Sequence, residues 1–90
     1  MTVTRNRRIT YQTNVILADL LKREAKASGL EVSRATDIKW SVIAPVLTRF
    51  EDRGWVVSEL REAGLGSFET RFYELTPLGR QEARGKLARS

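Results

Sequence analysis

Apolar side chains recur at helical spacing in residues 10–28 and are separated by charged positions. The apolar members are Ile16, Leu17, Leu20, Leu21 and Ala25. One face of such a helix can be buried while the opposite face stays in water, so the pattern predicts a long first helix. Gly29 is expected to end it, because glycine readily adopts the left-handed conformation found at helix ends.

A short second helix fits residues 31–36, where Val32 and Ala35 can face inward. So short a helix is not stable in water by itself, so it must depend on its neighbours. We expect this segment to set the turn between the first helix and a third one.

The third helix is predicted over residues 42–53. Its inward positions are Ile43, Val46, Leu47 and Phe50. Ser41 is expected to be the N-cap, because its hydroxyl can accept a hydrogen bond from a free amide of the first turn. Pro45 lies early in the helix, where few intrahelical amide bonds are lost. Gly54 is expected to end the helix.

Two strand-like runs follow the third helix. Residues 55–61 and 68–75 are rich in β-branched and aromatic side chains, and residues 63–67 between them contain two glycines. This order predicts a β-hairpin with its loop at residues 63–67. A last helix is expected after Thr76, because a hydroxyl cap followed by proline is typical of a helix start.

The register of this hairpin stays open. Pairing Arg61 with Arg71 would place Val57 opposite Leu75, whereas a slip of one residue would exchange the two faces of the strand. Both faces carry apolar residues, so the pattern alone selects neither register.

Three N-terminal helices, a two-stranded hairpin and a C-terminal helix form the order of a winged helix-turn-helix, an α+β and mainly helical fold. We interpret residues 10–90 as this domain. Residues 1–9 have no apolar period and are expected to form a flexible basic arm. A winged helix exposes its third helix and its hairpin on one side, where both can meet duplex DNA.

Composition favours a polyanionic partner. The chain has 90 residues, with 16 Lys and Arg against 11 Asp and Glu, for a net charge of +5. This charge attracts nucleic acid at any physiological pH. With no Cys and no His, disulfides, thiolate sites and the commonest general base are excluded, and the carboxylates show no metal-ligand spacing. We therefore expect no enzymatic activity, no metal and no cofactor.

No apolar run approaches the roughly 20 residues that a membrane span requires. The N-terminal residues include arginines but are not followed by an apolar stretch of the signal type. We expect a cytoplasmic protein without a membrane partner.

The outward side of the third helix carries small side chains, which would let the helix approach the floor of a major groove. Thr48 and Arg49 are candidates for contacts to base edges, and Ala44 for a thymine methyl group. Lys39 and Ser41, at the start of the helix, are candidates for phosphate contacts. The alternative is that Lys39, Thr48 and Arg49 are ordinary solvated side chains.

The two tryptophans are expected to differ. Trp40 precedes Ser41, and its spacing from Pro45 fits a hydrophobic staple that fixes how the chain enters the helix. Alternatively, Trp40 is an exposed aromatic that reaches nucleic acid or a partner chain. Trp55, after the Gly54 stop, is expected in the core.

Arginines flank the hairpin loop and occupy the N-terminal arm. Arg61 and Arg71 would lie where a wing contacts the DNA backbone or enters the minor groove, although acidic residues border the same loop. Arg5, Arg7 and Arg8 resemble basic arms that follow a minor groove. The alternatives are a solvated hairpin and an ordinary charged terminus.

These segments resemble a known family. Residues 41–56, SVIAPVLTRFEDRGWV, and residues 71–80, RFYELTPLGR, are similar to the PadR-like winged-helix regulators. The resemblance implies a DNA-binding transcriptional regulator, usually a repressor and usually dimeric. Ala44 departs from the tyrosine common before the helix proline, the wing has few basic residues, and the sequence stops soon after the last helix begins. MarR-like regulators share some of this pattern but carry an Asp-x-Arg in the wing that is absent here.

We therefore expect a sequence-specific regulator of double-stranded DNA, forming a homodimer through its first and last helices, with any effector unspecified. One alternative is a protein-interaction adaptor that uses Trp40, Leu65 and Phe68 as an apolar patch. Another is an architectural protein that binds DNA without sequence preference.

Overall fold

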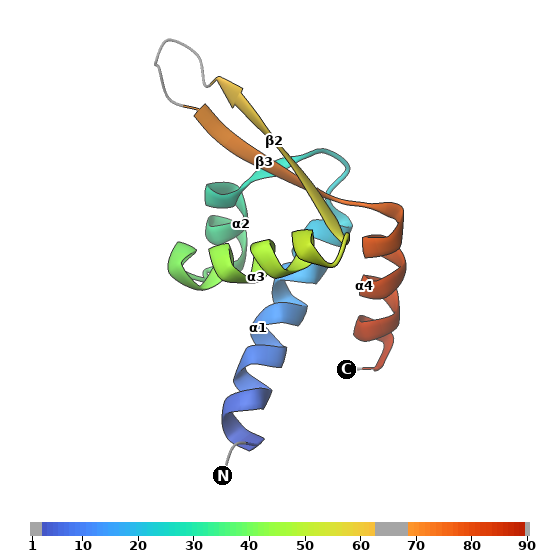
Figure 1. Cartoon of the computed structure of the whole chain (residues 1–90). Helices are drawn as coiled ribbons and strands as arrows, with labels where there is room; N and C mark the ends of the chain where they lie inside the picture. Colours follow the sequence, from blue (N-terminus) through green and yellow to red (C-terminus); the bar gives the residue numbers. More distant parts are fainter. Residues whose placement is uncertain (1–2, 63–68, 90) are drawn as a thin grey trace.

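The computed structural model describes residues 3–62 and 69–89, and side chains within residues 11–61 and 70–89. These residues form four helices and a three-stranded antiparallel sheet. Figure 1 shows the β2–β3 hairpin above α1 and α3. The elements are α1 (Val3–Lys22), β1 (Ala27–Ser28), α2 (Gly29–Thr36), α3 (Trp40–Asp52), β2 (Val56–Glu62), β3 (Glu69–Leu75) and α4 (Pro77–Arg89). This is the predicted winged helix-turn-helix, an α+β and mainly helical fold.

The first helix is displaced from its expected limits. α1 starts at Val3 and ends at Lys22, so the backbone of residues 3–9 is helical where the sequence pattern indicated a loose arm. No glycine or proline interrupts that segment, and arginine is a good helix former. The N-terminal half of α1 projects away from the rest of the domain (Figure 1).

Gly29 does not end the first helix, as the sequence pattern suggested, but begins α2. Ser28 is the N-cap: its hydroxyl accepts a hydrogen bond from the Glu31 amide at 3.1 Å, and its own amide donates to the Glu31 carboxylate at 2.8 Å. This reciprocal capping box satisfies two backbone donors that a helix start leaves free. α2 ends at Thr36, and its C-cap, Asp37, takes the left-handed conformation with φ of 58°.

α3 begins earlier than expected. Its N-cap is Lys39, whose backbone carbonyl accepts hydrogen bonds from the amides of Val42 at 2.9 Å and Ile43 at 3.1 Å. The prediction that Ser41 caps this helix is wrong, because Ser41 is the second helical residue. Pro45 lies inside the helix and is exposed.

The sheet has the strand order β1-β3-β2. β2 and β3 pair with Val56 opposite Leu75 and Leu60 opposite Arg71, which is the register one residue away from an Arg61–Arg71 pair. Residues directly opposite each other share a face of a sheet. This register therefore turns Val56 and Leu75 together toward the helices, where both are buried.

The sheet also contains a strand that the sequence pattern did not predict. β1 pairs with β3 through Ala27 opposite Tyr73 and Ser28 opposite Phe72. A two-residue strand has no periodicity of its own, and residues 27–28 were expected within the first helix. The strand covers only part of the free edge of β3.

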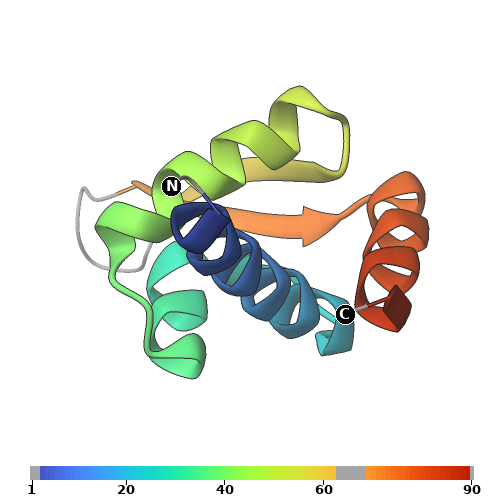
Figure 2. The same ribbon diagram turned by 90° about the horizontal axis from the view of Figure 1, so that it is seen from below.

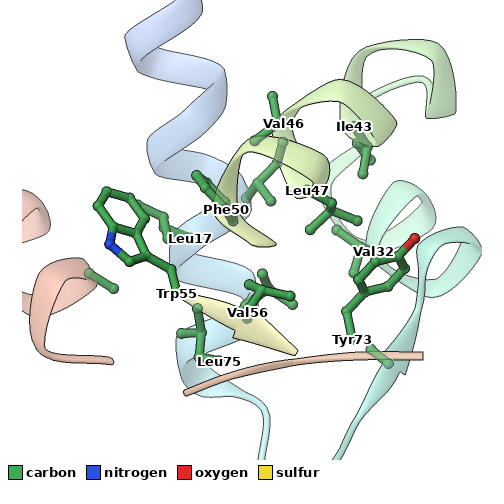
Figure 3. Packing of buried hydrophobic residues seen from close by; sticks show 14 residues of the cluster. Leu17, Val32, Ile43, Val46, Leu47, Phe50, Trp55, Val56, Tyr73 and Leu75 are labelled. Carbon is green, nitrogen blue, oxygen red and sulfur yellow. The ribbon is translucent and has the colours of Figure 1, made fainter. Parts of the chain in front are cut away.

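The core lies between the helices and the inner face of the sheet (Figure 3). The predicted inward stripe of α3 is confirmed, because Ile43, Val46, Leu47 and Phe50 are all buried. Trp55 is confirmed as a core residue with 8% of its surface exposed, and its ring centroid lies 5.5 Å from that of Phe50.

α4 begins as the sequence predicted. The Thr76 hydroxyl accepts a hydrogen bond from the Gly79 amide at 2.9 Å and donates to the Gly54 carbonyl at 2.7 Å. This one side chain therefore both caps α4 and ties it to the turn after α3. Figures 1 and 2 show α4 beside α1, with which it packs.

Candidate nucleic-acid interface

The exposed side of α3 forms a narrow ridge of mostly small side chains. Its members, called the α3 ridge below, are Ser41, Pro45, Thr48, Arg49 and Asp52. They lie opposite the buried stripe, as the spacing of a helix requires. No described element packs over these side chains, so the ridge is open to a ligand along its length (Figure 1).

Thr48 and Arg49 lie side by side on this ridge, as predicted. The Thr48 hydroxyl donates a hydrogen bond to the Ala44 carbonyl at 3.0 Å, which leaves its oxygen free to accept a further hydrogen bond. Arg49 is exposed and forms no ion pair with any side chain that the structure describes. Ala44 lies at the edge of the ridge and is partly buried.

The start of α3 offers positive charge without a competing cap. Lys39 is exposed, and its side chain makes no capping hydrogen bond to the first turn. Ser41 is exposed one residue into the helix. The amides at a helix start carry the positive end of the helix dipole, so this end of α3 has the chemistry that suits a phosphate.

Trp40 does not form the expected hydrophobic staple with Pro45. Because Lys39 is the N-cap, Trp40 is the first helical residue and does not have the staple spacing to Pro45. Its ring lies over Gly29 at the start of α2, so closely that a Cβ on Gly29 would overlap the ring. The indole is still 46% exposed, so Trp40 combines a packed face with an open one.

Arg71 lies on the inner face of the hairpin and is linked to α3. Its guanidinium Nη1 donates to the Ser58 hydroxyl at 2.9 Å, and that hydroxyl donates to Glu51 Oε2 at 2.7 Å. The chain of hydrogen bonds joins both strands of the wing to the last turns of α3. Arg71 remains exposed, so it stays available to a ligand.

Arg61 lies on the outer face of the same hairpin. Its guanidinium donates to Glu59 Oε1 at 2.9 Å and lies 4.9 Å from the centre of the Phe72 ring. Lys26 pairs with the same carboxylate oxygen. The hydrogen bonds from Lys26 and Arg61 hold the pKa of Glu59 below its ordinary value of 4.5. Glu59 therefore neutralises part of the positive charge of the wing.

The structure thus gathers only some of the predicted site residues. Lys39, Ser41, Thr48 and Arg49 share one helix, and Arg71 lies near that helix through Ser58. Arg61 faces away from Arg71 because of the observed register.

The remaining predicted contacts fall outside the described side chains. Arg5, Arg7 and Arg8 belong to the backbone of α1, but their side chains are not among those described. The predicted loop at residues 63–67 and Phe68, and with them Leu65 and Phe68 of the proposed adaptor patch, lie outside the described residues as well.

A groove between the wing and the helices was not predicted from the sequence. It has a volume of about 580 Å³ and is lined by residues 28–30, Trp40 and residues 70–73. Its walls come from β1, α2, α3 and β3, and β3 is distant from the others in the sequence, so no local pattern could have revealed it. Leu30, on its rim, is 58% exposed.

Metal sites and membrane spans are both absent from the described residues. Within residues 3–62 and 69–89, no group of three or more acidic residues, histidines or cysteines could hold a metal ion. In the same part of the chain, no helix combines the length and the apolar character needed to cross a membrane.

Solved structures share this fold. A PadR-like transcription factor from Bacteroides fragilis aligns with a TM-score of 0.83 and 18% identity over 99% of this chain and 88% of its own. A PadR family regulator from Eggerthella lenta aligns with a TM-score of 0.76 and 25% identity over 98% of this chain and 78% of its own.

Bacillus subtilis PadR, solved in complex with operator DNA, aligns with a TM-score of 0.75 and 26% identity over 88% of this chain. The alignment spans about half of that protein, 48% of its length. No protein-family model matches the sequence, and no curated protein matches it significantly. The structural neighbours confirm the PadR-like winged-helix resemblance.

Proposed function

We propose that this chain is a sequence-specific, double-stranded DNA-binding transcriptional regulator. α3 enters the major groove, and the β2–β3 wing lies on the backbone or in the minor groove. The observation that carries this proposal is the α3 ridge: an uncovered helix face of small side chains, with Lys39 at its start and Arg49 along it. Such a face can approach base edges closely.

The contacts divide into two classes. The free oxygen of Thr48 can accept a hydrogen bond from a base, and Arg49 can donate two to guanine, while Ala44 can contact a thymine methyl group. Lys39 and the first amides of α3 suit phosphate, and these contacts position the helix without reading sequence.

The operator complex of Bacillus subtilis PadR supports this proposal, because that protein shares the fold over 88% of this chain. The net charge of +5 supports it independently, since phosphate contacts supply much of the affinity of DNA-binding proteins. The proposed outcome is repression without a catalytic role, because the PadR-like regulators that this chain resembles are usually repressors. The proposed compartment is the cytoplasm.

We also propose a homodimer formed through α1 and α4. α1 projects beyond the body of the domain (Figure 1), and Tyr11 on α1 is 71% exposed while Leu78 on α4 is 47% exposed. A two-fold dimer would recognise half-sites about one DNA turn apart. Light scattering at micromolar concentration should show twice the chain mass, and a pure monomer would contradict the dimer.

Selection from a random duplex pool tests the function. The regulator should enrich a defined sequence, and its retention of that duplex in a gel shift should fall steeply as salt rises. An architectural protein would bind with the same salt dependence but enrich no sequence. An adaptor would retain no duplex even at low salt, which would overturn the proposal.

A further inference from the structure

One wall of the groove between the wing and the helices is apolar and contains the Trp40 ring. Trp40 is held by contact with Gly29, where the absence of a side chain makes room for the indole. Leu30 continues the same surface on α2, with 58% of its surface exposed, beside the 46% exposed indole. Two large apolar side chains are thus displayed together on a surface that the domain's own core does not cover.

The other wall comes from β3, and its one cation is Arg71, which lies among Thr70, Phe72 and Tyr73. The described hydrogen-bond partner of the Arg71 side chain is the hydroxyl of Ser58. The groove therefore combines an apolar surface with one guanidinium around an open volume of about 580 Å³. A deoxyribose beside a phosphate has the matching chemistry, because the sugar offers an apolar face and the phosphate a negative charge.

The position of the groove matches the same ligand. The groove is lined by the starts of α2 and α3 and by β3 of the wing. One DNA strand always separates a major groove from the adjacent minor groove. If α3 occupies the first and the wing the second, that strand must pass between them.

We infer that this groove holds the sugar–phosphate strand between the two DNA grooves, with Trp40 and Leu30 against the sugars and Arg71 on a phosphate. This inference rests on the proposed function. Gly29 then has a role that the sequence did not suggest: because it lacks a Cβ, the Trp40 ring can pack closely against the start of α2, where the strand would pass over it.

A pair of glycine variants tests whether the packing of Trp40 on Gly29 matters for binding. The Cβ of Gly29→Ala would overlap the Trp40 ring and displace it. The backbone at Gly29 is helical, so it accepts alanine without strain. Gly85→Ala in α4 is the matched control, because its Cβ would meet only Arg89 Nη1 at 3.7 Å. With the duplex enriched by the selection above, we expect Gly29→Ala to weaken binding by about tenfold and Gly85→Ala to leave it unchanged.

Tryptophan fluorescence supplies a second measurement on the unchanged protein. Trp55 is buried and Trp40 is half-exposed, so acrylamide should quench mainly Trp40, and Trp40→Phe identifies its share. We expect the duplex to protect this share from acrylamide. Quenching that is unaltered in the bound complex, or equal binding by Gly29→Ala and Gly85→Ala, would overturn the groove assignment while leaving the proposed function intact.

Two further outcomes would also overturn the inference. In the first, Trp40 becomes better protected from acrylamide as the protein concentration rises in the absence of DNA. That result would show that a second copy of the chain covers the groove. Failure of the unchanged protein to retain any duplex would overturn both the inference and the proposed function.

Discussion

Ser58 in β2 donates a hydrogen bond to Glu51 in α3, with 2.7 Å between the hydroxyl and carboxylate oxygens. Arg71 in β3 donates to the same hydroxyl. The wing is therefore tied by side chains to the helix that we place in the major groove. Contact between helix and wing matters because both must meet one duplex at a fixed separation.

Removing this hydroxyl should affect binding more than stability. Ser58→Ala breaks both of these hydrogen bonds, which are exposed to solvent, so we expect the free energy of unfolding to fall by less than about 1 kcal/mol. Duplex affinity should fall about threefold to tenfold, because Arg71 and the wing lose their fixed position. Ser58→Thr keeps the hydroxyl and is the control. Equal affinities for the two variants would show that the link does not position the wing.

The close approach of α4 to the turn after α3 predicts a stability effect. A Cβ on Gly79 would collide with the backbone carbonyl of Trp55, so Gly79→Ala should lower the free energy of unfolding by about 1–3 kcal/mol. A Cβ on Gly85 would make only an ordinary van der Waals contact with Arg89 Nη1, at 3.7 Å, so Gly85→Ala should be neutral or slightly stabilising. Urea unfolding of the two variants measures the difference, and equal midpoints would contradict this packing.

Glu59 predicts a pH dependence of stability. Its pKa in the folded chain is lowered from 4.5 by hydrogen bonds from Lys26 and Arg61. A lowered folded pKa gives stabilisation that is present above the unfolded pKa and lost as pH falls through the folded pKa. Glu59→Gln should therefore flatten the acid side of the stability profile, below about pH 4.5. Parallel unfolding curves for the two proteins across that range would be inconsistent with this pairing.

The same carboxylate should limit DNA affinity. Glu59 forms an ion pair with Arg61, so Glu59→Gln frees this guanidinium for a phosphate. The slope of the logarithm of affinity against the logarithm of salt concentration should then steepen by up to about 0.9. Glu74→Gln removes the same charge from the outer face of β3 without breaking an ion pair among the described side chains, and is the matched control. If both variants bind alike, Glu59 acts only through net charge.

Local patterns were sufficient for the parts of the fold with strong periodicity or chemistry. The buried stripe of α3 follows from apolar residues at helical spacing, and the start of α4 follows from the Thr76-Pro77 pair. Both features depend on residues within one or two helical turns, so a local sequence pattern is enough to predict them. The open face of α3 then follows as the opposite side of its buried stripe.

Other features depend on contacts between distant segments. Gly29 resembled a helix stop, but its surroundings are set by the Trp40 ring, which arrives from α3. The Ser28–Glu31 spacing of the capping box was the local signal that could have corrected this prediction. β1 and the hairpin register depend on β3 and the core, and Arg61 moved to the outer face with that register.

The most direct measurement is the affinity of the Thr48→Ala/Arg49→Ala double variant for the selected duplex, beside its affinity for a random duplex. Both side chains are exposed, so the free energy of unfolding measured in urea should stay within about 0.5 kcal/mol of that of the unchanged protein. Affinity for the selected duplex should fall by at least about tenfold, and most of the preference over the random duplex should disappear. An undiminished preference in the folded double variant would contradict a role for α3 in reading the DNA sequence.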